Sequence, residues 1–402
     1  MQSVNSRSTS GTAVVCAVVF LVAALTAKTA VAQTSPKFLY STEYRGGKVH
    51  GYLVDPNTGA LKPTGQNPPW AHWGPSKVAS DKGGYRLYVI NWGSKDLNAY
   101  FIDRRNGYIY GVPGSPFHIG QNPTDVKVHP SGHYVYVTAQ SNWVYAFQVQ
   151  SNGSLVMVPG SPFSTVNKPQ ALAIDPLGKY LYVSSYPASS TPATSEVDAF
   201  TISSTDGALT PVPGSPYVEP NSQFCSNGAW DMAIHPSGNF LILPNMCEGL
   251  VVYRIGRTTG TLSLISGSPF VPPVGGFTSI GNVESIAMDP QGVYFWVTDQ
   301  YCNSGCSMST DTWKLNTTTG VPTYLESGMG GCGLLTRPDP SGKFVYEIGD
   351  LTSNTACDPG ATPGIWGFTA NRTNGTLTNI PGSPWPSTNS DSFWSDGLTI
   401  TP

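Results

Sequence analysis

Three short sequence markers recur in a fixed order along this chain of 402 residues, and they restrict the possible folds more than any other feature. The first marker is a glycine in a polar turn, as in Asp55-Pro-Asn-Thr-Gly59. Glycine supplies the positive φ that tight hairpin turns require. Successive copies lie 46 to 60 residues apart, a spacing typical of repeat architectures. The turn glycines are Gly59, Gly107, Gly153, Gly207, Gly260, Gly320 and Gly375.

Two further markers flank these turns. A Gly-Ser-Pro tripeptide followed by an aromatic residue begins at Gly114, Gly160, Gly214, Gly267 and Gly382. An Asp/His-Pro-x-Gly turn precedes a Tyr/Val-rich segment at residues 129–132, 175–178, 235–238, 289–292 and 339–342. Together the three markers divide the chain into seven units.

Each unit contains four segments with strand character. In the fourth unit we predict strand A at Gln170–Ile174, strand B at Tyr180–Ser184, strand C at Glu196–Ile202 and strand D from Leu209. Four short antiparallel strands per repeat are typical of a β-propeller blade, whereas a parallel β-helix needs much shorter repeats. We therefore predict an all-β fold, a seven-bladed propeller of four-stranded antiparallel blades.

The two ends of the chain complete one blade between them. The first unit opens with strand B at Phe38-Leu-Tyr40 and lacks strand A. The chain ends with Asp396-Gly-Leu-Thr-Ile-Thr-Pro402, which aligns with Gln170–Pro176 of the fourth unit. We predict that this C-terminal strand closes blade 1, because closure leaves no free sheet edge.

The N-terminus has the features of a secretory signal peptide. Arg7 precedes an uninterrupted apolar run over residues 13–25, which is too short to span a bilayer, and Ala30-Val31-Ala32 matches an A-x-A cleavage site. We predict a signal peptide over residues 1–32, a propeller over 33–402 and a secreted or periplasmic location. The alternative is a retained membrane anchor. No later segment is long and apolar enough to span a membrane.

Charge argues against a nucleic-acid partner. The formal net charge is −3, and removal of the leader with Arg7 and Lys28 makes it −5. Nucleic-acid binding requires a basic face. We expect a monomer whose partner is a small molecule, a glycan or an envelope protein.

Six cysteines remain after the leader, and an even number in an exported chain indicates disulfides. Six cysteines allow 15 pairings, but the repeat alignment places four of them in equivalent loops of blades 5 and 7. The predicted pairs are Cys225–Cys247, Cys332–Cys357 and Cys302–Cys306. The alternative, a metal site, lacks a second cysteine pair at zinc spacing. We expect neither a metal nor a cofactor.

Propeller topology places the A–B and C–D turns on one face and the B–C and D–A loops on the other. The second set is long, for example at residues 186–195, 301–310 and 351–364. Long loops on a rigid scaffold commonly carry binding sites. We therefore place the site on this loop face, around the central channel.

Polar and aromatic residues at two repeat positions are the candidates. Residues just after strand B include Glu43, Tyr44, Arg45, Asn91, Trp92, Asn245, Asp299 and Gln300, and residues near the start of strand A include His72, Trp73, Asp125, Trp230, Asp231, Glu284 and Asp396. The alternative for each is a structural role, capping a turn or joining neighbouring blades. His129 and His235 lie in A–B turns, on the opposite face.

The Tyr134-Val-Tyr-Val-Thr138 and Tyr180-Leu-Tyr-Val183 segments, with the Gly-Ser-Pro-Phe endings, resemble the seven-bladed lactonase family. That family includes 6-phosphogluconolactonase-type propellers and is similar to YVTN-repeat proteins. Its lactonases carry Gly-Pro-Arg-His before one strand A, where this chain has Trp73-Gly-Pro-Ser76. Asn91-Trp92 and Asn245-Met246 keep an asparagine found in the family without the Glu or Arg that follows it.

Two functions are compatible with these residues. The first is a binding module in which Trp73, Trp92, Trp143 and Trp230 stack on a glycan or grip a protein, with Asp231, Asn245, Asp299 and Asp396 as further ligand contacts. The second, implied by the resemblance, is a lactone hydrolase. Hydrolysis needs a base and a donor for the developing oxyanion. Glu43 or Glu284 is then the predicted base, and Arg45 or Asn91 the predicted donor.

Overall fold

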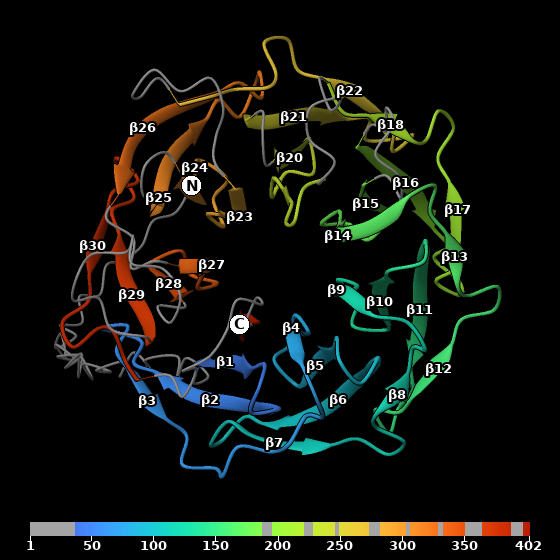
Figure 1. The fold of residues 1–402 in the computed structure, drawn as a ribbon, viewed down its shortest axis with the longest axis vertical. Coiled ribbons are helices and arrows are strands. Elements are labelled where there is room, and N and C mark those ends of the chain that lie inside the picture. The colour runs from blue at the N-terminus through green and yellow to red at the C-terminus, as the bar shows by residue number, and fades with distance from the viewer. Residues whose placement is uncertain are drawn as a thin grey trace, which may run out of the picture. The chain divides into compact units, whose positions relative to one another are not determined.

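Seven antiparallel sheets follow one another around a ring in the computed structural model of the chain (Figure 1). The structure describes residues 37–186, 195–220, 228–245, 249–272, 282–302, 306–328, 333–349, 364–386 and 397–402. All of them belong to one unit, Pro36–Pro402. Each sheet is a path of four strands in the order D-C-B-A, so the predicted seven-bladed propeller is confirmed.

The four strands of a blade occupy equivalent places in every repeat. The innermost strands A, in the order of blades 1 to 7, are β31 (Leu398–Ile400), β4 (Pro75–Ser80), β9 (Pro123–Val128), β14 (Lys168–Ile174), β19 (Ala233–Ile234), β23 (Asn282–Met288) and β27 (Gly333–Pro338). Strands B are β1 (Lys37–Glu43), β5 (Arg86–Asn91), β10 (Tyr134–Ala139), β15 (Tyr180–Tyr186), β20 (Phe240–Asn245), β24 (Tyr294–Cys302) and β28 (Phe344–Gly349).

The outer strands follow the same order. Strands C are β2 (Lys48–Val54), β6 (Asp96–Asp103), β11 (Trp143–Val149), β16 (Glu196–Ile202), β21 (Gly249–Ile255), β25 (Cys306–Leu315) and β29 (Gly364–Ala370). Strands D are β3 (Leu61–Pro63), β7 (Tyr108–Gly111), β12 (Leu155–Met157), β17 (Leu209–Pro211), β22 (Leu262–Leu264), β26 (Pro322–Gly328) and β30 (Leu377–Asn379). The two-residue strands β8 (Phe117–His118), β13 (Phe163–Ser164) and β18 (Tyr217–Val218) pair with strands C of blades 2 to 4.

Strand B is buried on both of its faces because a neighbouring blade covers each one. In β15, Tyr180 and Tyr182 pack in a cluster with blade 5, while Leu181 and Val183 pack in a cluster with blade 3. Side chains alternate between the two faces of a strand, so one Tyr-x-Tyr segment serves two blade interfaces. The core is therefore a ring of interfaces between blades.

The turn glycines pack against the neighbouring blade. Gly260 has φ +74°, and a Cβ placed there would lie 2.4 Å from the ring of Tyr180 in the preceding blade. The hydroxyl of Tyr182 donates to the carbonyl of the same glycine at 2.9 Å. The same bond joins Tyr40 to Gly107, Tyr136 to Gly207, and Tyr346 to Gly59, and Trp296 donates from its indole nitrogen to Gly375.

The Gly-Ser-Pro marker fastens the outer edge of a blade to strand C. Its serine hydroxyl accepts a hydrogen bond from a strand C backbone N–H in every copy, as from Ala199 to Ser215 at 2.9 Å. The other four bonds run from Ala99 to Ser115, Ala146 to Ser161, Val252 to Ser268 and Gly367 to Ser383.

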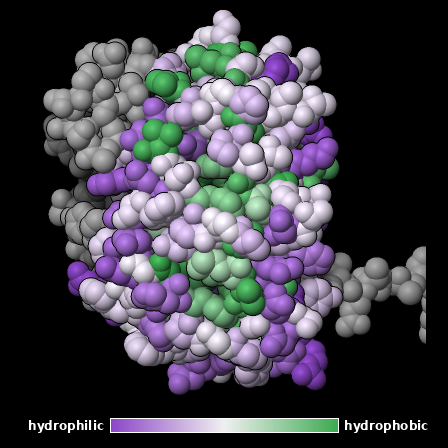
Figure 2. Space-filling model, turned by 90° about the vertical axis from the view of Figure 1, so that its right-hand side faces the viewer, coloured by the Kyte–Doolittle hydropathy of each residue, from purple (hydrophilic) through white to green (hydrophobic). Residues whose placement is uncertain are grey.

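Seen edge-on in Figure 2, the outer rim of the propeller carries apolar side chains among hydrophilic ones. Val156 and Met157 of β12 are exposed.

The predicted closure is confirmed, because β31 pairs with β1 as strand A of blade 1. The backbone N–H of Thr401 donates to the carbonyl of Phe38 at 2.8 Å, and its hydroxyl accepts from the N–H of Phe38 at 2.9 Å. His129 and His235 lie in A–B turns as predicted. Each ring also lies within hydrogen-bond distance of the A–B turn in the next blade, at Gly178 and Gly292.

The predicted signal peptide lies outside the described residues, as do Cys225, Cys247, Cys332 and Cys357. The backbones of Cys302 and Cys306 lie opposite each other in the β24–β25 hairpin. The three disulfides remain predictions.

We expect Tyr182→Phe to destabilise the propeller by about 1–2 kcal/mol, because it removes a buried hydrogen bond and leaves the Gly260 carbonyl without this donor. The urea midpoint of unfolding measures the change. Tyr88→Phe is the matched control, because the buried Tyr88 hydroxyl has no hydrogen-bond partner among the described residues. Equal destabilisation by the two variants would contradict a stabilising role for the interblade bond.

Candidate functional site

Several innermost strands carry a β-bulge near their start, on the loop face. The register of β4 against β5 skips Ser76, that of β9 against β10 skips Thr124, and that of β14 against β15 skips Gln170. A bulge bends a strand and re-aims the extra side chain. All three bulged residues line one cavity at the mouth of the channel. Glu284 has the same place in the register of blade 6.

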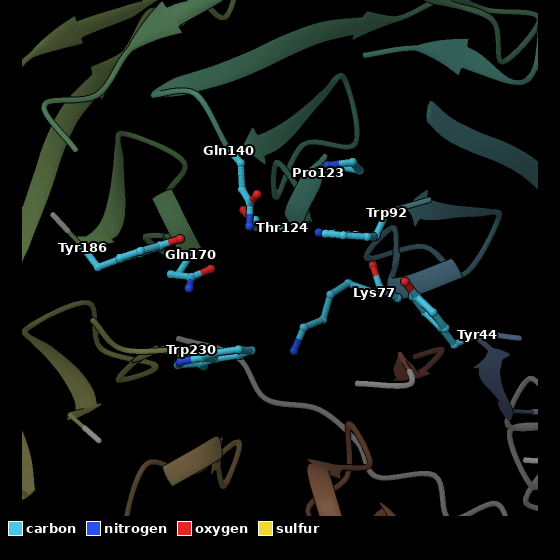
Figure 3. A pocket seen from close by; sticks show the side chains of 10 residues that line it. Tyr44, Lys77, Trp92, Pro123, Thr124, Gln140, Gln170, Tyr186 and Trp230 are labelled. Atoms are coloured by element: carbon cyan, nitrogen blue, oxygen red, sulfur yellow. The ribbon is translucent and has the colours of Figure 1, made fainter. Parts of the chain in front are cut away.

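We call this the mouth cavity; its volume is about 230 Å³, and blades 1 to 5 contribute to it (Figure 3). It is bounded by residues that directly follow a strand B or end it, and by residues at the start of a strand A. The lining residues are Tyr44, Ser76, Lys77, Trp92, Pro123, Thr124, Gln140, Gln170, Tyr186 and Trp230.

Aromatic rings and amides dominate this lining. In Figure 3, Trp92 and Trp230 enter from opposite sides of the cavity, and Gln140 and Gln170 lie to one side of the two rings. Burial raises the pKa of Tyr186, so its phenol stays protonated and remains a hydrogen-bond donor at neutral pH.

Two polar atoms at the mouth cavity lack partners. The hydroxyl of Ser76 and the indole nitrogen of Trp230 are buried without a hydrogen bond among the described residues. Ser76 itself is only 7% exposed. Buried polar groups are nearly always satisfied by protein, water or ligand. Because both atoms are buried, a molecule in the cavity does not reach them in this conformation.

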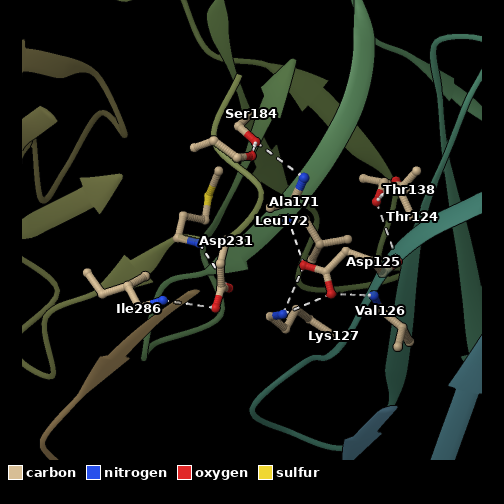
Figure 4. A network of polar contacts seen from close by, with 12 residues as sticks. Thr124, Asp125, Val126, Lys127, Thr138, Ala171, Leu172, Ser184, Asp231 and Ile286 are labelled. Atoms are coloured by element: carbon tan, nitrogen blue, oxygen red, sulfur yellow. Dashed lines mark hydrogen bonds and ion pairs between the residues drawn. The ribbon is translucent and has the colours of Figure 1, made fainter. Parts of the chain in front are cut away.

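A second cavity of about 220 Å³, which we call the channel cavity, shares Lys77 with the first. Two ion pairs stand beside it: Lys127 Nζ lies 2.9 Å from Asp125 Oδ2, and Arg337 Nη1 lies 2.8 Å from Asp231 Oδ2. Figure 4 shows Asp125 and Asp231 bonded to backbone N–H groups of other blades. The charged groups thus also hold the innermost strands together.

The charged groups of this cluster shift the pKa values of Asp231 and Lys77. Burial alone would raise the pKa of Asp231, but Arg337, Lys127 and Lys77 outweigh it and hold that pKa below its usual value. Burial lowers the pKa of Lys77, against the opposing effect of Asp231 and Asp125.

The predicted site residues have different surroundings. Trp92 and Trp230 line the mouth cavity, as does Tyr44. Trp73 is 59% exposed and is not among the lining residues. Arg45 is exposed, in the turn that follows β1.

Two predicted residues, Glu43 and Asn91, contact polar side chains on a neighbouring strand. The carboxylate of Glu43 lies 2.9 Å from the His50 ring, across the β1–β2 hairpin. The fully buried Asn91 donates its amide N–H groups to Asp96 and Asn98, both at 2.5 Å.

The remaining predicted residues divide into two groups. Asn245 is fully buried and donates to Glu219 at 2.7 Å, and Asp231 forms the ion pair with Arg337. The side chains of Glu284 and Asp299, and the whole of Asp396, lie outside the described residues. Their roles remain predictions.

Sequence reasoning did not select Lys77, Gln140, Gln170 or Tyr186. The same alignment could have identified three of them. Gln140 directly follows strand B of blade 3, Tyr186 ends strand B of blade 4, and Gln170 is the bulged residue of its strand A. Lys77 had no comparable signal, because a lysine on an innermost strand reads as a surface residue until the channel is known.

A buried carboxylate lies at the loop face of blade 4. Asp198 on β16 accepts from the Ser185 hydroxyl at 2.9 Å and from the Val166 backbone N–H at 3.2 Å. Burial raises the pKa of Asp198 to about 6, and these hydrogen bonds oppose the rise only in part.

We expect stability to fall between about pH 4 and pH 6, because over this range the unfolded chain ionises Asp198 while the folded chain keeps it protonated. A shift of about two pKa units corresponds to roughly 3 kcal/mol. Asp198→Asn should therefore be more stable than the wild type at pH 7 and equal to it at pH 4. Urea unfolding at both pH values measures this, and a difference independent of pH would refute the assignment.

Among the described residues, no helix is long and apolar enough to cross a membrane. Within the same part of the chain, no group of three or more His, Cys, Asp or Glu side chains is placed to hold a metal ion.

The fold is shared with solved structures. A periplasmic gluconolactonase of Pseudomonas aeruginosa, PpgL, superposes with a TM-score of 0.68 at 17% identity, over 91% of this chain and 99% of that chain. A proposed 6-phosphogluconolactonase of Bacteroides fragilis has a TM-score of 0.67 at 17% identity, over 92% and 99%. Hydrazine synthase of Kuenenia stuttgartiensis reaches 0.52 at 17% identity, over 86% and 95%.

No protein-family model matches the chain, and no curated protein matches it in sequence. Identities at this level show that the propeller fold is shared. Activity has to be argued from the site itself.

Proposed function

We propose that this protein binds a monosaccharide-sized polyhydroxylated ligand, a sugar or a sugar lactone, in the mouth cavity. The observation that carries the proposal is the lining, in which two tryptophans enter the cavity together with amide and hydroxyl side chains.

Size supports a single ring. Cavities that take drug-sized ligands measure about 300–1,000 Å³, and the mouth cavity, at about 230 Å³, is smaller. A pyranose or lactone ring is a ligand of suitable scale.

Chemistry supports a polyol. The apolar face of a sugar ring packs on an indole face, which supplies large contact area at little entropic cost. Hydroxyls in the ring plane then meet the Gln140 and Gln170 amides, which both donate and accept.

We expect Trp230→Ala to weaken binding of glucose or glucono-1,5-lactone at least tenfold, because the variant removes one stacking wall of the cavity. Calorimetric titration measures the dissociation constant. Tyr110→Ala is the control, because Tyr110 is 52% exposed on the outer strand β7. Equal loss in both variants, or unchanged affinity in Trp230→Ala, would argue against the mouth cavity as the site.

Lactone hydrolysis is the second candidate. It is favoured by the fold shared with the Pseudomonas periplasmic gluconolactonase and by the position of Glu284 in the bulge register of blade 6. A carboxylate there is our choice of base to activate water, and Lys77 is our choice of donor to the developing oxyanion. Glu43 is a weaker choice because its carboxylate already contacts His50. Asn91 is a weaker donor because its amide N–H groups are already used.

If the protein is a hydrolase, Glu284→Gln should lower kcat on glucono-1,5-lactone by about 10²–10⁴-fold, the usual contribution of a general base. Acid release followed at constant pH, above the spontaneous rate, measures it. Glu43→Gln should retain most of the activity. No turnover by the wild type on any aldonolactone would remove this candidate and leave the binding proposal intact.

Export, the three disulfides and a monomeric state are also proposals. A periplasmic neighbour of the same fold is compatible with export.

A further inference from the structure

Five charged side chains from four different blades surround the channel cavity or pair with a residue that lines it. They are Lys77 of β4, Asp125 and Lys127 of β9, Asp231 directly before β19, and Arg337 of β27. Among the described residues this cluster has three cations and two carboxylates.

The carboxylate of Asp125 is fully engaged. Both of its oxygens lie within 3.0 Å of Lys127 Nζ. Oδ1 also accepts from the Val126 backbone N–H at 2.8 Å, and Oδ2 accepts from that of Leu172 at 2.9 Å.

The carboxylate of Asp231 is engaged in the same way. Its Oδ2 accepts from Arg337 at 2.8 Å and from the Ile286 backbone N–H at 3.3 Å. Its Oδ1 accepts from the Met232 backbone N–H at 3.0 Å. Each carboxylate thus has one cation and two backbone donors of its own, so neither needs Lys77.

Lys77 is the remaining cation. Within the described ranges no hydrogen bond or ion pair satisfies its ammonium group, although that group lies close enough to Asp231 and Asp125 to feel their charges. It lines both cavities, and in Figure 3 its amine extends toward the middle of the mouth cavity. Partial burial makes an unpaired ammonium costly, and a bound anion would remove that cost.

We propose that Lys77, where the two cavities meet, binds an oxyanion carried by the ligand. The assignment of that ligand as an anionic sugar rests on the proposed function, whereas the oxyanion site follows from the channel charges alone. Lysine binds carboxylate and phosphate as a point charge, through charge-assisted hydrogen bonds.

The excess of one positive charge selects between the two oxyanions. A carboxylate carries one negative charge and balances Lys77, whereas phosphate carries up to two near neutral pH and would leave the cluster with an excess negative charge. The preferred ligand class is therefore a sugar acid, the chemical product of opening a sugar lactone.

The test is calorimetric titration of the full chain with three probes: sodium gluconate, neutral glucose and inorganic phosphate. We expect gluconate to bind at least tenfold more tightly than glucose, with phosphate weaker than gluconate. Lys77→Met should reduce gluconate affinity to that of glucose, and Lys77→Arg should retain most of the preference. Lys62→Met, on the exposed outer edge of β3, is the matched control and should bind like the wild type. Thermal unfolding of each variant establishes that it is folded.

Unchanged gluconate affinity in folded Lys77→Met would overturn the proposal, as would equal binding of gluconate and glucose by the wild type. In the second case glucose binding lost in Trp230→Ala would leave the proposed function standing. Conversely, gluconate or phosphate binding that depends on Lys77 but not on Trp230 would support the oxyanion site and contradict the sugar-binding mouth cavity. Tighter binding of phosphate than of gluconate would keep the site and overturn its carboxylate preference.

Discussion

The packing of an aromatic ring of one blade against the turn glycine of the next is the interaction on which the ring depends. A single four-stranded sheet exposes two apolar faces and is stable only when neighbours cover both of them. Tyr182 and Gly260 show how two blades are aligned: the ring of Tyr180 packs where a glycine leaves room, and the Tyr182 hydroxyl fixes the height of the contact. Repetition of this contact aligns the blades, and β31 then closes the circle.

Closure of the ring creates a polar channel whose walls are the innermost strands. Charged side chains link those strands across blades. Asp125 joins blades 3 and 4, and Asp231 joins blades 5, 6 and 7. Charges in such a place have a structural role and also set the electrostatic character of anything that enters. Lys77 is the exception, because it belongs to neither of the two ion pairs.

The mouth of the channel acquires its lining from a local irregularity. A bulge at the start of strand A turns Ser76, Thr124 and Gln170 into one cavity, although they lie in three repeats nearly 50 residues apart. The residue that follows or ends strand B, such as Trp92, reaches the same place from the other side. Equivalent positions can therefore differ freely in chemistry while the scaffold stays constant, which is how repeat folds commonly vary their binding surfaces.

The sequence by itself determined the blades, their number, their strand order and the closing strand, because the turn glycine is a local signal that recurs seven times and is accompanied by aromatic and aliphatic strand segments. Through the repeat alignment it also selected Trp92 and Trp230, which both line the mouth cavity. Only the tertiary structure decided which polar residues are already engaged. In the repeat alignment, Asn91 and Asn245 lie at the end of strand B and are site candidates just as Trp92 is. Their amides, however, are buried against Asp96, Asn98 and Glu219. Lys77 became a candidate only when strands from four blades met, because whether a charge is paired depends on neighbours that are distant in the chain.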